Sequence, residues 1–342
     1  MSSSISSSSA VLADAAVAAP SRTRRVLLVL ALALLGLEAV TRLKLFHMSK
    51  DFVQFASYPE RAATLGGRDG TRVAVIGNSI THEDIDPGAF AERLQALTGT
   101  HAYADILSVD HSYINTWQYV LEQYFWRPDH HVDVVMIPFW GTNLYDGNEI
   151  EIGRLAQFFT TVDDWPEILT RDLRTNADRA DFLVSSGWAT FAARDRMREL
   201  VFTVALPDFK GYARREQDVV TNHQIAVAAG KPKPRRTAYA LERLLRRARE
   251  EHTTLLFIAF PTLHVEWSDT YEDLARLIDQ AGMRYMDLRG TGDVGERNYV
   301  DLVHMNEAGR TIFTRRLAES IAPLLRCDGA TCRVAPAATA PQ

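Results

Sequence analysis

The sequence has little excess of either charge. Its 342 residues contain 38 Lys and Arg against 43 Asp and Glu, which gives a formal net charge of −5. Such a small net charge creates no broad field that attracts polyanions, so nucleic acid is not an expected partner. The one basic stretch, residues 235–250, is interleaved with leucines at helical spacing, and we interpret it as the solvent face of a helix.

Cysteine is almost absent. The only two, Cys327 and Cys332, lie five positions apart near the C-terminus with no histidine beside them. Two ligands do not complete a zinc site. The Asp-Gly pair between them could form a turn that closes a small disulfide loop in an oxidising compartment. Two free thiols in a tail are the alternative.

The histidines lack the spacing of metal ligands. His82, His111 and the adjacent His130 and His131 have no acidic partner at a spacing typical of a metal site. We interpret them as polar surface or pocket-lining residues. We expect neither a metal nor another cofactor.

The N-terminal region contains the longest apolar run. Residues 1–21 are rich in Ser and Ala without any periodicity, which predicts a disordered tail. Arg22, Arg24 and Arg25 precede an uncharged run that Glu38 interrupts. We predict a single membrane-spanning anchor at 22–46, in the inner (cytoplasmic) membrane, with the tail cytoplasmic and the remainder periplasmic or extracellular. A cleaved signal peptide is the alternative.

Beyond this region the composition is that of a globular protein, with 46% hydrophobic and 24% charged residues and no visible internal repeat. Apolar runs alternate with helical patterns, which predicts a parallel sheet covered by helices on both faces. We expect strands at 72–77, about 104–109, 132–139, 254–260 and 283–287, and helices at about 86–98, 114–126, 236–251, 268–281 and 306–324.

The remaining segments are assigned by exclusion. Residues 47–71 show no clear period and are interpreted as a linker, and 72–325 as the main domain. Within it, residues 150–235 do not alternate and are largely helical in propensity, which predicts an insertion or lid. Residues 326–342 are interpreted as a C-terminal tail.

Ser79 follows the first predicted strand at a Gly-Asn-Ser turn. A serine hydroxyl becomes a strong nucleophile only when a base removes its proton, so the sequence must also supply a histidine with an orienting carboxylate. Asp301 and His304 lie three residues apart, just before the last predicted helix. A turn at this spacing can place the carboxylate on one imidazole nitrogen and leave the other facing Ser79.

A third group follows the apolar run at 134–139, where the chain reads Trp140, Gly141, Thr142, Asn143. Ligands bind at this edge of open parallel sheets. The Asn143 amide could donate a hydrogen bond to a developing oxyanion. Trp140 could form a pocket wall or stack on a sugar ring, and we assign Trp140 and Gly141 to substrate binding.

Taken in this order, these blocks resemble the SGNH (GDSL-like) hydrolase superfamily over residues 72–325, with the insertion unmatched. The resemblance implies a three-layer α/β/α, flavodoxin-like fold. It implies Ser79 as nucleophile, His304 as base and Asp301 as its orienter, with oxyanion donors from the Ser79 backbone N–H and the Asn143 side chain. The matching residues are Gly77-Asn78-Ser79, Gly141-x-Asn143 and Asp301-x-x-His304.

The sequence departs from the family pattern in three places. Asn78 stands where the family usually has Asp before the nucleophile. The family's second block carries a glycine that completes the oxyanion hole, but the segment 106–117 has none, and Ser112 or His111 is the candidate for that place. Leu144 follows Asn143 where the family has an acid, so that role is absent or passes to Asp146.

The anchor and the three blocks together look like membrane-linked members of the superfamily that move acetyl groups on extracellular or cell-wall polysaccharides. We therefore expect an exported esterase or O-acetyltransferase that works through an acyl-Ser79 intermediate on an acylated glycan or small acyl ester. A membrane acyl-donor protein is a further candidate partner. The alternative is a non-catalytic scaffold of the same fold that binds glycan or an assembly partner.

Overall fold

The structure, a computed structural model, describes residues 21–335 apart from 46, 48, 128–129, 147–149, 210, 213–235, 264–270 and 291–293. The predicted disordered tail therefore lies outside the described residues except for Ser21. The last part of the predicted insertion, residues 213–235, also lies outside them.

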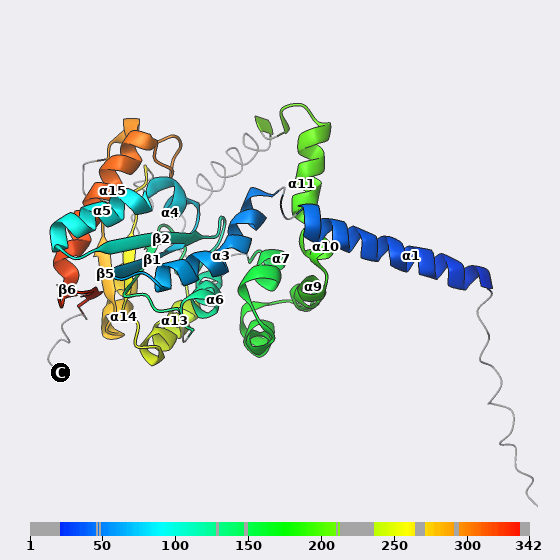
Figure 1. The fold of residues 1–342 in the computed structure, drawn as a ribbon, viewed down its shortest axis with the longest axis horizontal. Helices are drawn as coiled ribbons and strands as arrows, with labels where there is room; N and C mark the ends of the chain where they lie inside the picture. Colours follow the sequence, from blue (N-terminus) through cyan, green and yellow to red (C-terminus); the bar gives the residue numbers. More distant parts are fainter. Residues whose placement is uncertain are drawn as a thin grey trace, which may run out of the picture.

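A five-stranded parallel sheet forms the centre of the molecule (Figure 1). Its strand order is β2-β1-β3-β4-β5, the order typical of flavodoxin-like folds, so the predicted fold class is confirmed. Each strand lies within two or three residues of its predicted position. The strands are β1 (Thr71–Gly77), β2 (Ala102–Ser108), β3 (Val134–Phe139), β4 (Leu255–Ala259) and β5 (Arg284–Asp287).

Helices cover both faces of this sheet, and alternate strand residues point to the two faces. Val73 and Val75 of β1 pack in one core cluster, and Ala74 and Ile76 in the other. The first cluster includes α4 (Ser79–Asp84), α5 (Pro87–Thr98) and α15 (Glu307–Ile321). The second includes α6 (Ile114–Tyr124), α13 (Tyr239–Glu250) and α14 (Glu272–Gln280).

The segment that we interpret as a linker is instead helix α3 (Lys50–Gly66), which packs on the α6 face of the sheet. Its buried residues recur every three or four positions: Phe52, Phe55, Tyr58, Ala62 and Leu65. This is the spacing of one helix face, so the linker prediction is wrong: the segment has a helical period of its own. The sheet is therefore covered by α3 in addition to the predicted helices.

The insertion is helical where it is described. Its longer helices are α9 (Asn176–Gly187) and α11 (Arg194–Ala205), joined by α10 (Ala189–Ala192). Shorter turns precede them: α7 (Ile152–Arg154), η2 (Leu155–Phe159), η3 (Val162–Asp164), α8 (Trp165–Glu167) and η4 (Ile168–Asp172).

A buried ion pair attaches this insertion to the main domain. Asp172 at the end of η4 lies 3.0 Å from the Arg243 guanidinium of α13 and also accepts a hydrogen bond from the Tyr119 hydroxyl of α6. The two charged side chains are less than one-tenth exposed. Removal of either partner would leave a buried charge unpaired, so the contact fixes the insertion firmly.

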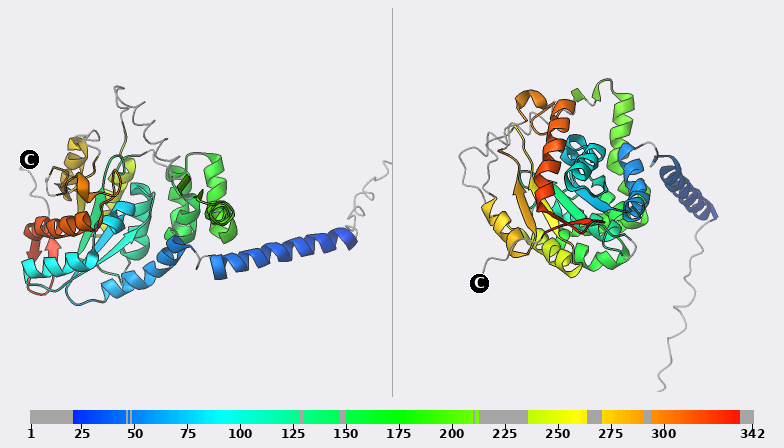
Figure 2. Two further views of the ribbon diagram at one scale, coloured as in Figure 1. Left: turned by 90° about the horizontal axis from the view of Figure 1, so that it is seen from above. Right: turned by 60° about the vertical axis from the view of Figure 1, so that its left-hand side comes forward.

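The N-terminal apolar segment forms α1 (Ser21–Val40), continued by η1 (Thr41–Leu45). Residues Arg22–Lys44 are long and apolar enough to cross a membrane. The helix projects away from the domain, with side chains such as Val26 and Leu35 about two-thirds exposed (Figures 1 and 2). An apolar helix with almost no contact to the protein is suited to an anchor or a signal sequence.

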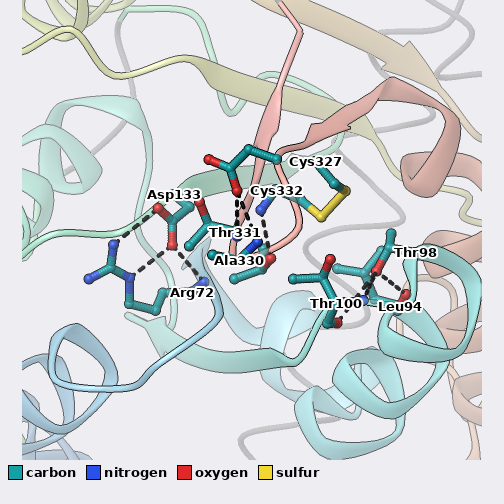
Figure 3. Close-up of a disulfide and its surroundings, with 11 residues drawn as sticks. Arg72, Leu94, Thr98, Thr100, Asp133, Cys327, Ala330, Thr331 and Cys332 are labelled. Carbon is teal, nitrogen blue, oxygen red and sulfur yellow. Dashed lines mark hydrogen bonds and ion pairs between the residues drawn. A yellow bond between two sulfur atoms is a disulfide. The ribbon is translucent and has the colours of Figure 1, made fainter.

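The predicted C-terminal tail is a packed hairpin over its first ten residues. Strands β6 (Leu325–Cys327) and β7 (Cys332–Val334) are antiparallel, and the two cysteines form a disulfide (Figure 3). Cys332 is fully buried, and its backbone N–H donates to the Thr71 hydroxyl at the start of β1. The disulfide loop thus lies against the amino ends of the strands, whereas the predicted site residues follow their carboxyl ends.

Candidate active site

Ser79 is the first residue of α4, directly after β1, and its side chain is half-buried. The preceding Gly77 is required by packing, because a Cβ there would lie 2.0 Å from the hydroxyl oxygen of Thr81, a fully buried side chain. The chain can therefore turn tightly from strand to helix. The turn presents Ser79 at the carboxyl edge of the sheet.

The structure brings Ser79, His304 and Asp301 together, although 225 positions separate the serine from the histidine. Ser79 Oγ lies 2.9 Å from His304 Nε2, and Asp301 Oδ2 lies 2.9 Å from His304 Nδ1. A carboxylate can only accept hydrogen bonds, so Nδ1 carries the proton and Nε2 is left as the acceptor of the Ser79 hydroxyl. This is the arrangement of a nucleophile, a base and its orienter.

Backbone contacts hold Asp301 in this position. The N–H groups of Val303 and His304 donate to Asp301 Oδ1 over 2.9 and 2.8 Å. Burial acts to raise the pKa of Asp301, but these hydrogen bonds and the His304 ring outweigh it, and the pKa is lowered. The Asp301 carboxylate is therefore ionised at neutral pH.

The pKa of His304 moves in the opposite direction. Burial of the ring acts to lower it, but the hydrogen bond and negative charge of Asp301 prevail, helped by Glu83 and Asp84, and the pKa is raised. The imidazolium that forms when His304 takes a proton is thus stabilised. This property suits a general base.

Asn78 connects the three loops at this edge of the sheet. Its Nδ2 lies 3.4 Å both from the Ser112 carbonyl oxygen after β2 and from Asn143 Oδ1 after β3. Both partners are acceptors, so the position needs a donor. An aspartate at residue 78 would place a carboxylate against two oxygens, which accounts physically for the departure from the usual Asp.

Asn143 is buried, and its amide has a defined orientation. Asn143 Oδ1 accepts from the Trp140 backbone N–H at 3.0 Å and from Asn78. Because the oxygen end is used in this way, the NH₂ end is the part of the amide available to donate to a substrate oxygen.

The turn that carries Asn143 has further support. Gly141 has a positive φ of 53°, a conformation that favours glycine, and its carbonyl oxygen accepts from the buried Tyr271 hydroxyl at 3.1 Å. Trp140 is half-buried and packs against the core cluster that includes α4, α5 and α15. Trp140 and Gly141 therefore lie in the same turn as Asn143, at the predicted edge.

The side chain of Ser112 does not face the site. Its hydroxyl donates to the Val109 carbonyl and accepts from the Trp117 indole N–H at 2.7 Å, and the side chain is buried. The Ser112 hydroxyl is therefore used within the fold and is not available as an oxyanion donor. His111 beside it is exposed and has a positive φ of 55°, the conformation that glycine would adopt most readily.

The other candidate for a missing family contact, Asp146, has a different role. Its carboxylate accepts from the Thr237 hydroxyl and from the backbone N–H groups of Tyr239 and Ala240, so it caps α13. Leu144 is fully buried in the core. Asp146 is therefore not the acid that follows Asn143 in the family pattern.

Asp84, which sequence reasoning missed, lies close to His304. It is fully buried, and its Oδ1 accepts from the Met305 backbone N–H at 2.8 Å. Its Oδ2 has no hydrogen-bond partner within the described residues, and burial raises its pKa to about 7. No sequence signal separates it from the neighbouring acids Glu83 and Asp86.

No protein-family model matches the chain, and no curated protein matches it in sequence. Similar solved structures include LAE5, an α/β hydrolase enzyme from the metagenome of Lake Arreo, Spain. The match has 13% identity and a TM-score of 0.35, and covers 74% of this chain and 96% of that one.

Two similar structures are of Axe2 variants. One is described as an acetyl-xylooligosaccharide esterase from Geobacillus, with 10% identity, a TM-score of 0.36 and coverage of 73% of this chain and 94% of that one. The other is a catalytic mutant described as an acetylxylan esterase from Geobacillus stearothermophilus, with 11% identity, a TM-score of 0.35 and the same coverages.

Proposed function

We propose that the protein is a membrane-anchored serine esterase or O-acetyltransferase of the SGNH type. In this proposal the catalytic domain lies on the periplasmic or extracellular side of the inner (cytoplasmic) membrane. The enzyme acts on an acylated cell-envelope or extracellular polysaccharide. The observation that carries this proposal is the Ser79–His304–Asp301 geometry, with 2.9 Å at both polar contacts.

The proposed reaction has two halves. Ser79 Oγ attacks the acyl carbonyl carbon while His304 Nε2 takes the hydroxyl proton, and the oxyanion accepts hydrogen bonds from the Ser79 N–H and the Asn143 amide. When the C–O bond to the glycan breaks, His304 returns the proton to the leaving oxygen. The acyl-Ser79 ester is then attacked by water or by a sugar hydroxyl, with His304 again as base.

A polar cavity beside the insertion offers a place for a glycan, although neither Ser79 nor His304 is part of its lining. A cavity of about 670 Å³ lies between the loop after β2 and the insertion. Its lining is rich in groups that hydrogen-bond to hydroxyls, including His111, Tyr113, Arg154, Arg174, Arg194 and Glu199. Arg154 also donates to the Asp110 carbonyl oxygen at 2.9 Å, which connects the insertion to this loop.

The proposed orientation of the chain across the membrane rests on the charges that flank α1. Arg22, Arg24 and Arg25 precede the apolar part of α1, and basic residues favour the cytoplasmic side. The domain that follows α1 would then be exported, where an acylated polysaccharide and a membrane acyl-donor protein are accessible.

The test uses the full chain in detergent or nanodiscs. We expect a fluorophosphonate probe to label the wild type at Ser79, and the wild type to hydrolyse p-nitrophenyl acetate. The Ser79→Ala and His304→Ala variants should each lose about 10³-fold or more of this turnover, because they disable one proton-transfer unit.

The double Ser79/His304 variant should be hardly slower than either single variant. A folded Ser79→Ala protein with wild-type turnover would contradict the proposal. An unlabelled and inactive wild type would favour the non-catalytic scaffold. Release of acetate from an O-acetylated oligosaccharide, compared with transfer to an added glycan, separates the esterase from the transferase.

A further inference from the structure

Helix α11 is unusual in exposing apolar side chains along its C-terminal half. Val201 is 61% exposed, Val204 88% and Leu206, which directly follows the helix, 48%. None of the residues of α11 is buried. Isolated exposed apolar residues are common on soluble proteins, but a cluster within six positions indicates a surface that something else covers.

Polar contacts attach α10, the short helix that precedes α11, to the end of α1. Glu38 accepts hydrogen bonds from the backbone N–H groups of Ala189 and Thr190 at 2.9 and 2.8 Å. The Thr190 hydroxyl contacts both Glu38 and the fully buried Thr41. These contacts attach α10 to α1, and only Ala193 separates α10 from α11.

The direction of α11 is defined relative to α1. In Figure 1 α11 runs across the axis of α1 from the domain end of that helix, and the same crossing is visible in Figure 2. A helix that crosses a bilayer along α1 would therefore place α11 along the membrane surface. With about 1.5 Å per residue, its 12 residues extend roughly 18 Å over that surface.

The expected depth of α11 in the bilayer also corresponds to the lipid headgroup region. A bilayer core needs about 20 apolar residues of helix, so a span that begins after Arg25 ends near Arg42 and Lys44. Both side chains are exposed, and basic residues at the end of a span lie at headgroup level. Thr41, which contacts α10, lies at this same level.

We propose that the C-terminal half of α11, together with Leu206 directly after it, lies in the lipid headgroup and upper acyl-chain region of the bilayer that holds α1. This inference rests on the membrane anchoring in the proposed function, but not on the esterase chemistry. The occupant of the apolar surface is lipid, because α1 brings that surface to the membrane boundary. The protein would then be held at two points, which restricts how its domain tilts.

The test measures depth with a single label on the full chain in nanodiscs that hold one copy each. Both native cysteines are in the disulfide, so Val204→Cys gives one reactive thiol for a fluorophore. Lipids with a doxyl quencher near the headgroup should quench this label several-fold more than a label at Leu97→Cys. Interfacial helices lie about 5–10 Å deep, so quenchers near the chain end should act less.

The controls separate the possible outcomes. Leu97 is 41% exposed on α5, a helix that lies on the side of the domain away from α1 (Figure 1). Leu30 is 57% exposed in the middle of α1. If Leu30→Cys is quenched by deep doxyl groups while Val204→Cys behaves like Leu97→Cys, the proposal is overturned and the anchor stands. If neither Leu30→Cys nor Val204→Cys is quenched, the anchor and the proposal both fail.

The result is independent of catalysis. The same measurement in the Ser79→Ala background should give the same quenching, because Ser79 lies at the start of α4 and not on α11. A single copy in each nanodisc excludes burial of Val204 by a second chain. Val204→Cys that is shielded from aqueous iodide yet unaffected by doxyl lipid would point to a protein surface instead, and would overturn the proposal.

Discussion

The carboxyl edge of the sheet and the anchor side of the insertion are built differently. Strand β1, which leads to Ser79, is buried at every residue except Arg72. Helix α11, which follows the anchor contact, has no buried residue. The first region is held by continuous apolar packing, and the second by a few polar contacts between segments that are distant in sequence.

This difference matches the proposed tasks of the two regions. Proton transfer needs donor and acceptor fixed within hydrogen-bond distance, and a packed sheet edge provides that rigidity. A membrane-facing surface needs exposed apolar area and tolerates weaker attachment. A change at the edge should therefore affect rate without loosening the fold, whereas a change on the anchor side should loosen contacts without affecting rate.

Among variants that keep Ser79 and His304, the largest effect is expected at Asn143. Asn143→Ala removes an oxyanion donor and should slow acylation by about 10²–10³-fold. Asn143→Asp is the matched variant, because it keeps an acceptor for the Trp140 N–H but lacks the NH₂ donor. We expect both variants to be slow in single-turnover acylation with p-nitrophenyl acetate.

If Asn143→Asp instead keeps most of the wild-type rate, Asn143 supports only the Trp140 turn. The melting temperature of each variant should be measured in parallel. If the variants lose acylation rate only in proportion to a lower melting temperature, the sheet edge does not differ from the anchor side in the way argued above.

The sheet and the three site blocks could be predicted because both depend on local signals. Buried strands appear as apolar runs, and a turn after each run places Ser79 and Asn143 at the same edge. Asp301 and His304 needed only a spacing of three and a following helix. The order of these blocks along the chain supplied the long-range information that single residues lack.

Asp84 could not be predicted, because the contact that distinguishes it is distant in sequence. Asp84 and Glu83 are adjacent acids, and only the Met305 contact from the other end of the chain distinguishes them. Ser112 is a different case, because the contacts that occupy its hydroxyl are local, at Val109 and Trp117, and the sequence does not show which way the side chain turns. The linker error at α3 differs, because its helical period is present in the sequence.

A smaller effect, mainly on pH dependence, is expected at Asp301. His304 must be unprotonated to act as a base, so kcat/KM should rise with pH through the pKa of His304 in the free enzyme. Asp301 raises this pKa against the effect of burial. Asp301→Asn should therefore move the rising limb to lower pH and reduce the plateau by less than Ser79→Ala does.

The direction of the shift is the diagnostic measurement, taken as kcat/KM for p-nitrophenyl acetate across the acid limb. Glu83→Gln serves as a control, since Glu83 also acts to raise the pKa of His304 but does not hydrogen-bond to the ring. It should shift the limb in the same direction by less. If the rising limb of Asp301→Asn stays in place or moves to higher pH, Asp301 does not act on His304 as proposed.

The smallest effect is expected at Glu38, where the anchor meets the insertion. Glu38→Ala removes the acceptor of two backbone N–H groups at the start of α10 and should cost about 0.5–2 kcal/mol locally, as loss of a helix cap does. Glu38→Gln keeps one acceptor oxygen and should lose less. Amide hydrogen exchange of residues 188–193, measured in nanodiscs, should be fastest in Glu38→Ala, intermediate in Glu38→Gln and slowest in the wild type. Turnover of p-nitrophenyl acetate should stay at the wild-type level in both variants, because the buried Asp172–Arg243 pair still holds the insertion on the sheet. A marked fall in turnover with either variant would show that the anchor contact extends to the catalytic edge and that the two regions do not act separately.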